Sequence, residues 1–142
     1  NAPVDPGSGG GGENVGVWGG NGGGLIRIEA SQKVSVKGSM MAKGEAVTQW
    51  GVGAGGGIYI TCQTFESDAN GSLNADGANG GQVGGGGGRI AVWRTNLATV
   101  ATSVIGGSGT WNSGAETGDY GTVVFGWIEP PPVNSGLFFR FE

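Results

Sequence analysis

Apolar and polar residues alternate along three short segments of this chain, and each segment follows a run of glycines. In the first segment Ile26 and Ile28 would face one side, with Arg27 on the other. The alternation returns at residues 58–62 and 90–93. A period of two residues is typical of a strand with one buried face, so the pattern predicts three β-strands that share an apolar stripe.

The three predicted strands recur at a fixed spacing, because Ile26, Ile58 and Ile90 are each 32 residues apart. A second motif, Gly38–Gly44, returns 33 residues later at Gly71–Gly77. A repeat of about 20 to 50 residues indicates a solenoid. We therefore predict an all-β fold, a short glycine-rich parallel β-helix whose inward aliphatic side chains stack from coil to coil. A β-sandwich is the alternative, although it needs no fixed internal period.

Glycine dominates the composition, with 35 of 142 residues against a usual share of about 7%. Collagen is excluded because no three-residue period exists and only 5 residues are proline. Disorder is disfavoured because 37% of residues are hydrophobic and only 13% are charged. We expect glycine at the corners of the coils, where it would supply positive φ and let stacked backbones approach closely.

The repeat divides the chain into three parts. Residues 1–14 are expected to form an extended N-terminal segment, and residues 15–129 the repeat domain. Three prolines at 130–132 then introduce a stiff link to a C-terminal strand within 130–142. That strand carries four apolar residues that we expect either to fold back over the core or to insert into a neighbouring copy. They are Leu137, Phe138, Phe139 and Phe141.

Two of the repeat motifs carry a family resemblance. Gly86-Gly87-Gly88-Arg89-Ile90-Ala91-Val92 and Gly71-Ser72-Leu73-Asn74-Ala75-Asp76-Gly77 are similar to the glycine-rich repeats of large secreted bacterial surface proteins. The resemblance covers roughly residues 15–127. It implies a β-solenoid in a cell-surface or matrix setting, and it brings no catalytic residue to this chain.

Charge and hydropathy restrict the partners. The net charge is −4 and the seven basic residues are scattered, so no basic stripe for nucleic acid is present. The sequence contains no apolar run of the roughly 18 residues that span a bilayer, and no signal peptide is visible. The chain starts at Asn1 and not at Met, so we expect it to be a mature or excised piece. Together with the composition, these observations predict an extracellular or cell-surface protein.

The residue types leave little room for catalysis. The absence of histidine excludes Ser-His-Asp and Cys-His arrangements and imidazole zinc sites. Cys62 falls on the inward stripe, where it is expected to be a buried small hydrophobe. Asp68 and Asp76 lie in Asn/Gly-rich stretches typical of turns, and they are also the weak candidates for calcium. We predict no enzyme activity and no cofactor.

Tryptophan is the remaining candidate for a binding residue. Trp18, Trp50 and Trp111 lie beside glycine runs, where their rings would either cover bare backbone or stack on sugar rings. We expect a structural subunit of an extracellular filament or matrix, a homo-oligomer or polymer that associates through open β-edges and its terminal strand. The alternative is an adhesin or carbohydrate-binding module that uses these tryptophans to bind a polysaccharide.

Overall fold

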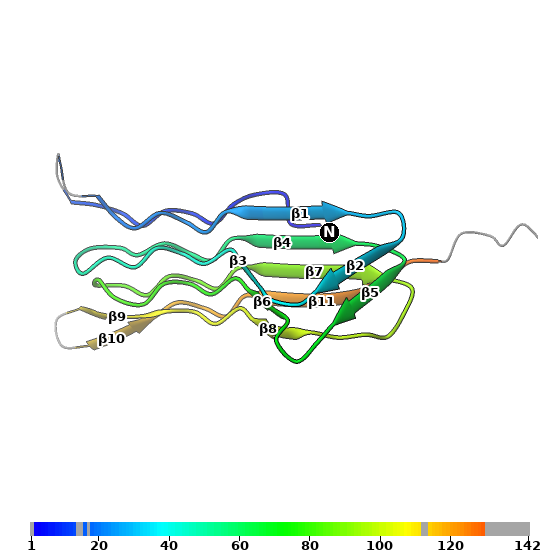
Figure 1. Cartoon of the computed structure of the whole chain (residues 1–142). Helices are drawn as coiled ribbons and strands as arrows, with labels where there is room; N and C mark the ends of the chain where they lie inside the picture. The colour runs from blue at the N-terminus through cyan, green and yellow to red at the C-terminus, as the bar shows by residue number, and fades with distance from the viewer. Residues whose placement is uncertain (1, 14–15, 17, 112–113, 130–142) are drawn as a thin grey trace, which may run out of the picture.

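The computed structural model describes residues 2–13, 16, 18–111 and 114–129, and these residues form strands and no helix. The strands are β1 (Leu25–Glu29), β2 (Lys33–Val36), β3 (Ser39–Met41), β4 (Gly57–Thr61), β5 (Thr64–Ser67), β6 (Ser72–Asn74), β7 (Arg89–Arg94), β8 (Ala101–Ser103), β9 (Ser108–Trp111), β10 (Gly114–Thr117) and β11 (Thr122–Trp127). They wind into a β-solenoid of about three turns, shown in Figure 1.

Three parallel sheets make up the walls of the solenoid. The largest has the strand order β1-β4-β7-β11, and the others are β2-β5 and β3-β6-β8. The predicted stacking is confirmed by the register, which pairs Ile26 with Ile58, Ile58 with Ile90, and Ile90 with Val123. Parallel pairing of equivalent residues is the pattern of a β-helix, so the β-sandwich alternative is wrong.

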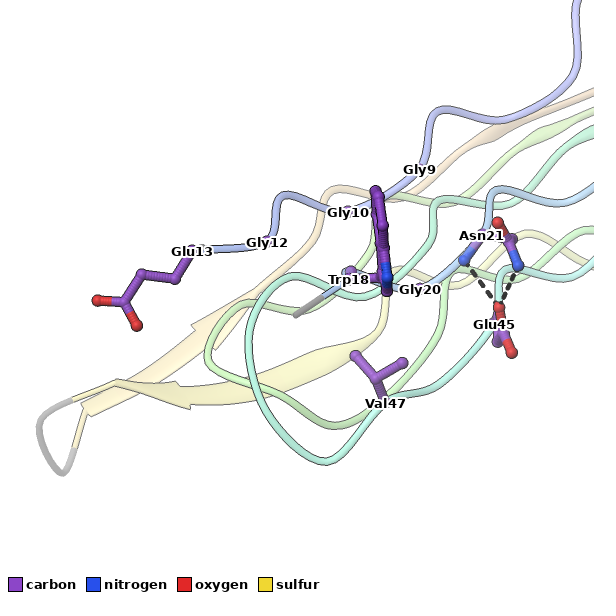
Figure 2. A pocket seen from close by; sticks show the side chains of 10 residues that line it. Gly9, Gly10, Gly12, Glu13, Trp18, Gly20, Asn21, Glu45 and Val47 are labelled. Carbon is purple, nitrogen blue, oxygen red and sulfur yellow. Dashed lines mark hydrogen bonds between the residues drawn. The ribbon is translucent and has the colours of Figure 1, made fainter. Parts of the chain in front are cut away.

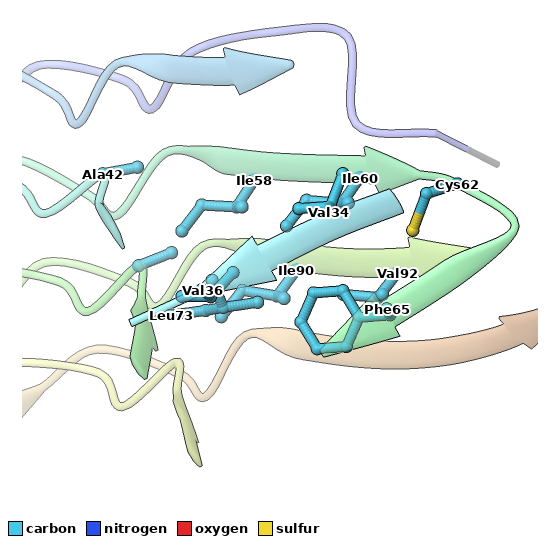
Figure 3. Packing of buried hydrophobic residues seen from close by; sticks show 11 residues of the cluster. Val34, Val36, Ala42, Ile58, Ile60, Cys62, Phe65, Leu73, Ile90 and Val92 are labelled. Atoms are coloured by element: carbon cyan, nitrogen blue, oxygen red, sulfur yellow. The ribbon is translucent and has the colours of Figure 1, made fainter. Parts of the chain in front are cut away.

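The core lies between the largest sheet and the β2-β5 sheet, as Figure 3 shows. Ile58, Ile60 and Val92 point from the largest sheet toward Phe65 of β5, and all four side chains are fully buried. Cys62 is buried beside them, as the stripe predicts. The stripe extends to the first coil, where Ile26 and Ile28 are partly buried, and to the last coil, where Phe125 is partly buried but Val123 is exposed. Among the described residues, the core is therefore closed in the middle coils and less covered at both ends.

The glycine runs do not form the corners of the coils. They extend together beyond the sheets as a bundle of extended segments, on the left of Figure 1, and we call this bundle the glycine arm. Its segments are residues 7–11, 19–24, 42–47, 51–56, 75–80, 83–88, 104–107 and 118–121.

Hydrogen bonds between neighbouring segments of the glycine arm recur at every third residue. Backbone N–H groups donate to backbone oxygens in the pairs Gly20 to Gly51, Gly23 to Ala54, Gly53 to Glu45, Gly56 to Ala42, Gly85 to Ala78, Gly88 to Ala75, Gly118 to Gly107 and Gly121 to Val104. Three residues per turn, with backbone bonds made to neighbours, is the geometry of packed polyproline II helices. We infer that conformation for the arm, since glycine also has a low preference for strands.

Close packing explains why the arm needs glycine. Gly53, Gly85 and Gly118 are equivalent in successive coils, and a Cβ on each would lie 1.8, 2.1 and 2.2 Å from a backbone oxygen of the coil before. Of the expected reasons for glycine, close approach holds at most positions of the runs, with exceptions such as Gly24 and Gly86. Positive φ is needed at few glycines of the described chain, such as Gly80 and Gly81.

The N-terminal segment packs against the arm. The N–H groups of Gly7 and Gly10 donate to the oxygens of Gly23 and Gly20, again three residues apart. On its other side, the Ser8 oxygen accepts a hydrogen bond from the N–H of Ala54. Residues 7–11 therefore form one more extended segment of the bundle, antiparallel to residues 19–24.

Candidate functional site

The residues that the sequence singles out are distributed over separate places in the molecule. Trp18 and Trp50 lie near the tip of the glycine arm, and Asp76 lies at its base, next to β6. The backbone of Trp111 ends β9, but its side chain lies outside the described residues. The predicted assembly residues Leu137, Phe138, Phe139 and Phe141 also lie outside them.

Trp18 stands in an open hollow of about 1040 Å³ at the first coil of the arm. Its side chain is 82% exposed. Figure 2 shows the indole ring between Gly10 and Val47, with Asn21 and Glu45 on one side and Glu13 on the other. The lining contains two carboxylates and no basic residue, so the hollow is apolar on the ring and acidic around it.

Trp50 occupies a different hollow, formed with Gly51, Val52 and Val83. Gly10, Gly12 and Glu13 line both hollows, whereas Trp18 and Trp50 each line only one of them. Trp50 lies at the turn between two arm segments with φ 69°, a left-handed conformation that is costly outside glycine. Its Nε1 is buried without a hydrogen-bond partner among the described residues. The buried Nε1 shows that this edge of the ring is turned away from solvent.

Asp68 has the bonding of a turn residue. Its Oδ1 accepts a hydrogen bond from the Asn70 N–H at 2.9 Å, and its side chain is exposed. Among the described residues no group of three or more His, Cys, Asp or Glu side chains could hold a metal ion. The bonds that Asp68 makes are explained by the turn, and they give calcium no additional support.

Asp76 joins three successive coils, which the turn interpretation does not predict. Its Oδ1 accepts hydrogen bonds from Ser103 Oγ at 2.5 Å and the Ile105 N–H at 2.8 Å, both in the following coil. Its Oδ2 accepts one from Asn74 Nδ2 at 2.8 Å and lies 3.9 Å from Lys43 Nζ of the preceding coil. Asp76 is thus a cross-link between coils at the base of the arm.

Two side chains have shifted pKa values. Burial alone would raise the pKa of Asp76, but the hydrogen bonds from Ser103, Ile105 and Asn74 and the charge of Lys43 lower it overall. Burial raises the pKa of the Cys62 thiol, against smaller opposing effects. Because the thiolate is the reactive form, Cys62 is positioned as a packing residue and not as a nucleophile.

The first coil of the arm ends in a polar cap. Asn21 is the first-coil equivalent of Gly53, whose N–H donates to the backbone oxygen of Glu45. The Asn21 N–H instead donates to the Glu45 carboxylate, Oε2, at 2.9 Å, and Asn21 Nδ2 donates to the same oxygen at 2.6 Å. A side-chain carboxylate therefore replaces the backbone carbonyl that another coil would supply. The sequence indicates this cap, because Asn21 and Glu45 stand at repeat positions where later coils have glycine or alanine.

The last coil carries a bulky side chain where earlier coils have glycine. Tyr120 is equivalent to Gly23, Gly55 and Gly87. A Cβ on Gly55 would lie 2.6 Å from the Gly88 nitrogen of the next coil, so this position points along the stack. Tyr120 is 79% exposed. A side chain at this position is therefore directed toward the place that a following coil would take.

Within the part of the chain that the structure describes, no strand pairs with the outer edge of β11. β11 is the end strand of the largest sheet, and its sequence, Thr122–Trp127, contains no charge and no proline. Val124 and Trp127 are 45% and 55% exposed. At the opposite edge, β1 carries an Arg27–Glu29 ion pair, with Arg27 also stacked over the ring of Tyr59 at 5.3 Å. The two edges of the sheet therefore differ in polarity.

Buried Arg94 fixes β11 to the coil before it. Arg94 is 6% exposed, and its Nε donates to the Ala98 oxygen at 2.6 Å. Its guanidinium lies over the Phe125 ring, 4.8 Å from the ring centre. Its Nη1 reaches the Gly126 oxygen at 3.4 Å. These contacts hold β11 against the coil before it, and among the described residues this is the side on which β11 is paired.

Comparison of the chain with protein-family models, curated proteins and solved structures found no match. The resemblance to glycine-rich repeats of secreted bacterial surface proteins therefore stays a prediction. Among the described residues there is no helix of the length and apolarity needed to cross a membrane.

Proposed function

We propose that this chain is a structural module of an extracellular protein that associates with itself through the open edge of β11. The observation that supports this function is the uncharged strand Thr122–Trp127 at the end of a parallel sheet. An end strand presents a row of N–H and C=O groups that can pair with another chain. Soluble proteins usually protect such edges with charge, proline or a covering element, and β11 has neither charge nor proline.

Sedimentation velocity over a concentration series tests this function on the full chain. We expect the average mass to rise with concentration. A monomer at every concentration contradicts the proposal. Removal of residues 133–142 separates the edge from the predicted C-terminal strand, and association through β11 should survive it. Loss of association in the truncated chain would transfer the role to Leu137, Phe138, Phe139 and Phe141.

A second candidate function is carbohydrate binding in the Trp18 hollow. An exposed indole offers an apolar face for the C–H groups of a sugar ring, and Asn21, Glu13 and Glu45 offer hydrogen-bonding groups around it. Two carboxylates and no basic residue in the lining favour neutral or amino sugars over acidic polysaccharides. This chemistry would suit an adhesin.

A glycan array tests the second candidate with a matched pair of variants. Trp18→Ala should abolish binding, whereas Tyr120→Ala removes a similarly exposed ring at the opposite end of the arm and should leave binding unchanged. Equal binding by both variants contradicts a site at Trp18, and no binding by the unmodified chain removes the candidate. Both outcomes are independent of self-association.

A further inference from the structure

We infer that the β11 edge pairs with the β11 edge of a second copy about a two-fold axis, and so forms a closed dimer and not a filament. This inference rests on the proposed self-association and names its partner and symmetry. A filament requires the last coil of one copy to stack on the first coil of the next, whereas a two-fold dimer uses the same surface on both copies.

Both ends of the glycine arm oppose coil-on-coil stacking. At the first coil, the Asn21 N–H that an incoming segment would bind is already bonded to the Glu45 carboxylate. At the last coil, exposed Tyr120 stands at the position whose equivalent, Gly55, would direct a Cβ toward the next coil. A copy added head to tail would have to displace this cap and bury a tyrosine ring where each preceding coil has a glycine. Head-to-tail growth is therefore disfavoured at both of its contact surfaces.

The backbone of β11 selects the groups that face a partner. The N–H groups of Thr122 and Ile128 donate to the coil before, to the oxygens of Gly88 and Arg94. Alternate residues of a strand direct their N–H and C=O to opposite neighbours. The intervening residues Val123, Phe125 and Trp127 therefore direct theirs to the open edge.

A two-fold axis at Phe125 pairs the outward N–H and C=O groups of Val123, Phe125 and Trp127 with those of a second copy. Two strands related by such an axis run antiparallel, and Phe125 then faces its own copy while Val123 faces Trp127 of the other chain. Each facing pair exchanges two hydrogen bonds. Val123, Phe125 and Trp127 share the core side of the sheet, so their apolar side chains would meet there on both copies. Val124 would lie opposite Gly126, on the outer face.

The first test compares lysine substitutions at two residues of similar exposure on the same sheet. Val124→Lys and Leu25→Lys both alter an exposed residue on the outer face of the largest sheet, at 45% and 37% exposure, but on opposite edges. We expect Val124→Lys to raise the dimer dissociation constant at least about tenfold, because lysine at an edge opposes strand pairing. Leu25→Lys should leave it unchanged.

The second test is cross-linking with a short bis-maleimide, since the only native thiol, Cys62, is buried. Val124→Cys should give a covalent dimer, because the two introduced thiols would lie diagonally across the axis at about 7–8 Å between Cα atoms. Leu25→Cys should give none. Cross-linking through Leu25→Cys, or masses that grow beyond the dimer, would overturn the two-fold arrangement while self-association stands. A monomer in every experiment would overturn both.

Discussion

Two adjacent glycines of the arm provide a direct test of the packing argument. Gly85 and Gly86 belong to one glycine run, yet a Cβ on Gly85 would lie 2.1 Å from the Gly53 oxygen and 3.0 Å from the Ala78 nitrogen. A Cβ on Gly86 would come no closer than 4.0 Å to another group, the Asp119 oxygen. Neither glycine has a positive φ. Alanine at the two positions therefore differs only in what its methyl group meets.

The expected loss follows from the hydrogen bonds around Gly85. Its N–H donates to Ala78, the Ala78 N–H donates to Gly53, and its oxygen accepts from Gly107, at 3.1, 3.0 and 2.7 Å. Separating these segments would weaken all three bonds, at about 1 kcal/mol each. Alanine also reduces the entropy of the unfolded chain, and this effect increases the free energy of unfolding by about 0.4–1 kcal/mol. Gly85→Ala should therefore destabilise the chain by about 2 kcal/mol, and Gly86→Ala should be neutral or slightly stabilising.

Urea unfolding of the two variants measures this difference, with thermal melting as a second readout. At about 3 °C per kcal/mol for a chain of this size, Gly85→Ala should lower Tm by about 6 °C. Gly86→Ala should keep or slightly raise Tm. Equal stabilities of the two variants would refute the claim that contact between neighbouring backbones requires glycine at position 85.

Three further predictions concern single side chains. Asp76→Asn should cost about 1–2 kcal/mol at neutral pH through weaker hydrogen bonds. The lowered pKa of Asp76 means that its contribution is complete above the unfolded pKa of about 3.9, so in acid unfolding curves the two proteins should converge as pH falls through the folded pKa. Glu45→Ala should speed amide hydrogen exchange at Asn21, whereas Glu45→Gln, which keeps an acceptor, should largely preserve protection. Cys62 should resist alkylation in the folded chain and react after denaturation, as mass spectrometry would show.

The sheet part of the fold is predictable from the sequence because its side chains alternate. The spacing of Ile26, Ile58 and Ile90 predicts the register of β1, β4 and β7, and the observed strand pairing confirms it. Alternation reports which face of a strand is buried, and strands with one buried face stack only in the register that keeps the apolar stripe continuous. The fourth strand, β11, follows at a spacing of 33 residues from Ile90 to Val123, and the repeat pattern indicates only its start.

The glycine arm is not predictable in the same way, because glycine has no side chain to show which direction is buried. The glycine content predicts corners with positive φ, whereas the runs form extended helices. A weaker signal is present in the sequence, since Gly53 and Gly56, like Gly85 and Gly88, keep a three-residue spacing. The caps at the two ends are also hard to predict, because the first depends on a contact between Asn21 and Glu45, which are 24 residues apart.

The end residues of the arm follow from the same rule that places glycine inside it. A position that points toward a neighbouring coil must be glycine only where that coil exists. Asn21 points toward the missing coil before the first, and Tyr120 points toward the missing coil after the last, so both can carry side chains. In each case a side chain that is tolerated there would have to move or be buried before another coil could join the arm. The sheet has no such device at β11, because the end strand keeps its outward N–H and C=O groups whatever side chains it carries. The proposed association through β11 therefore uses an edge that the side chains of the arm do not cover.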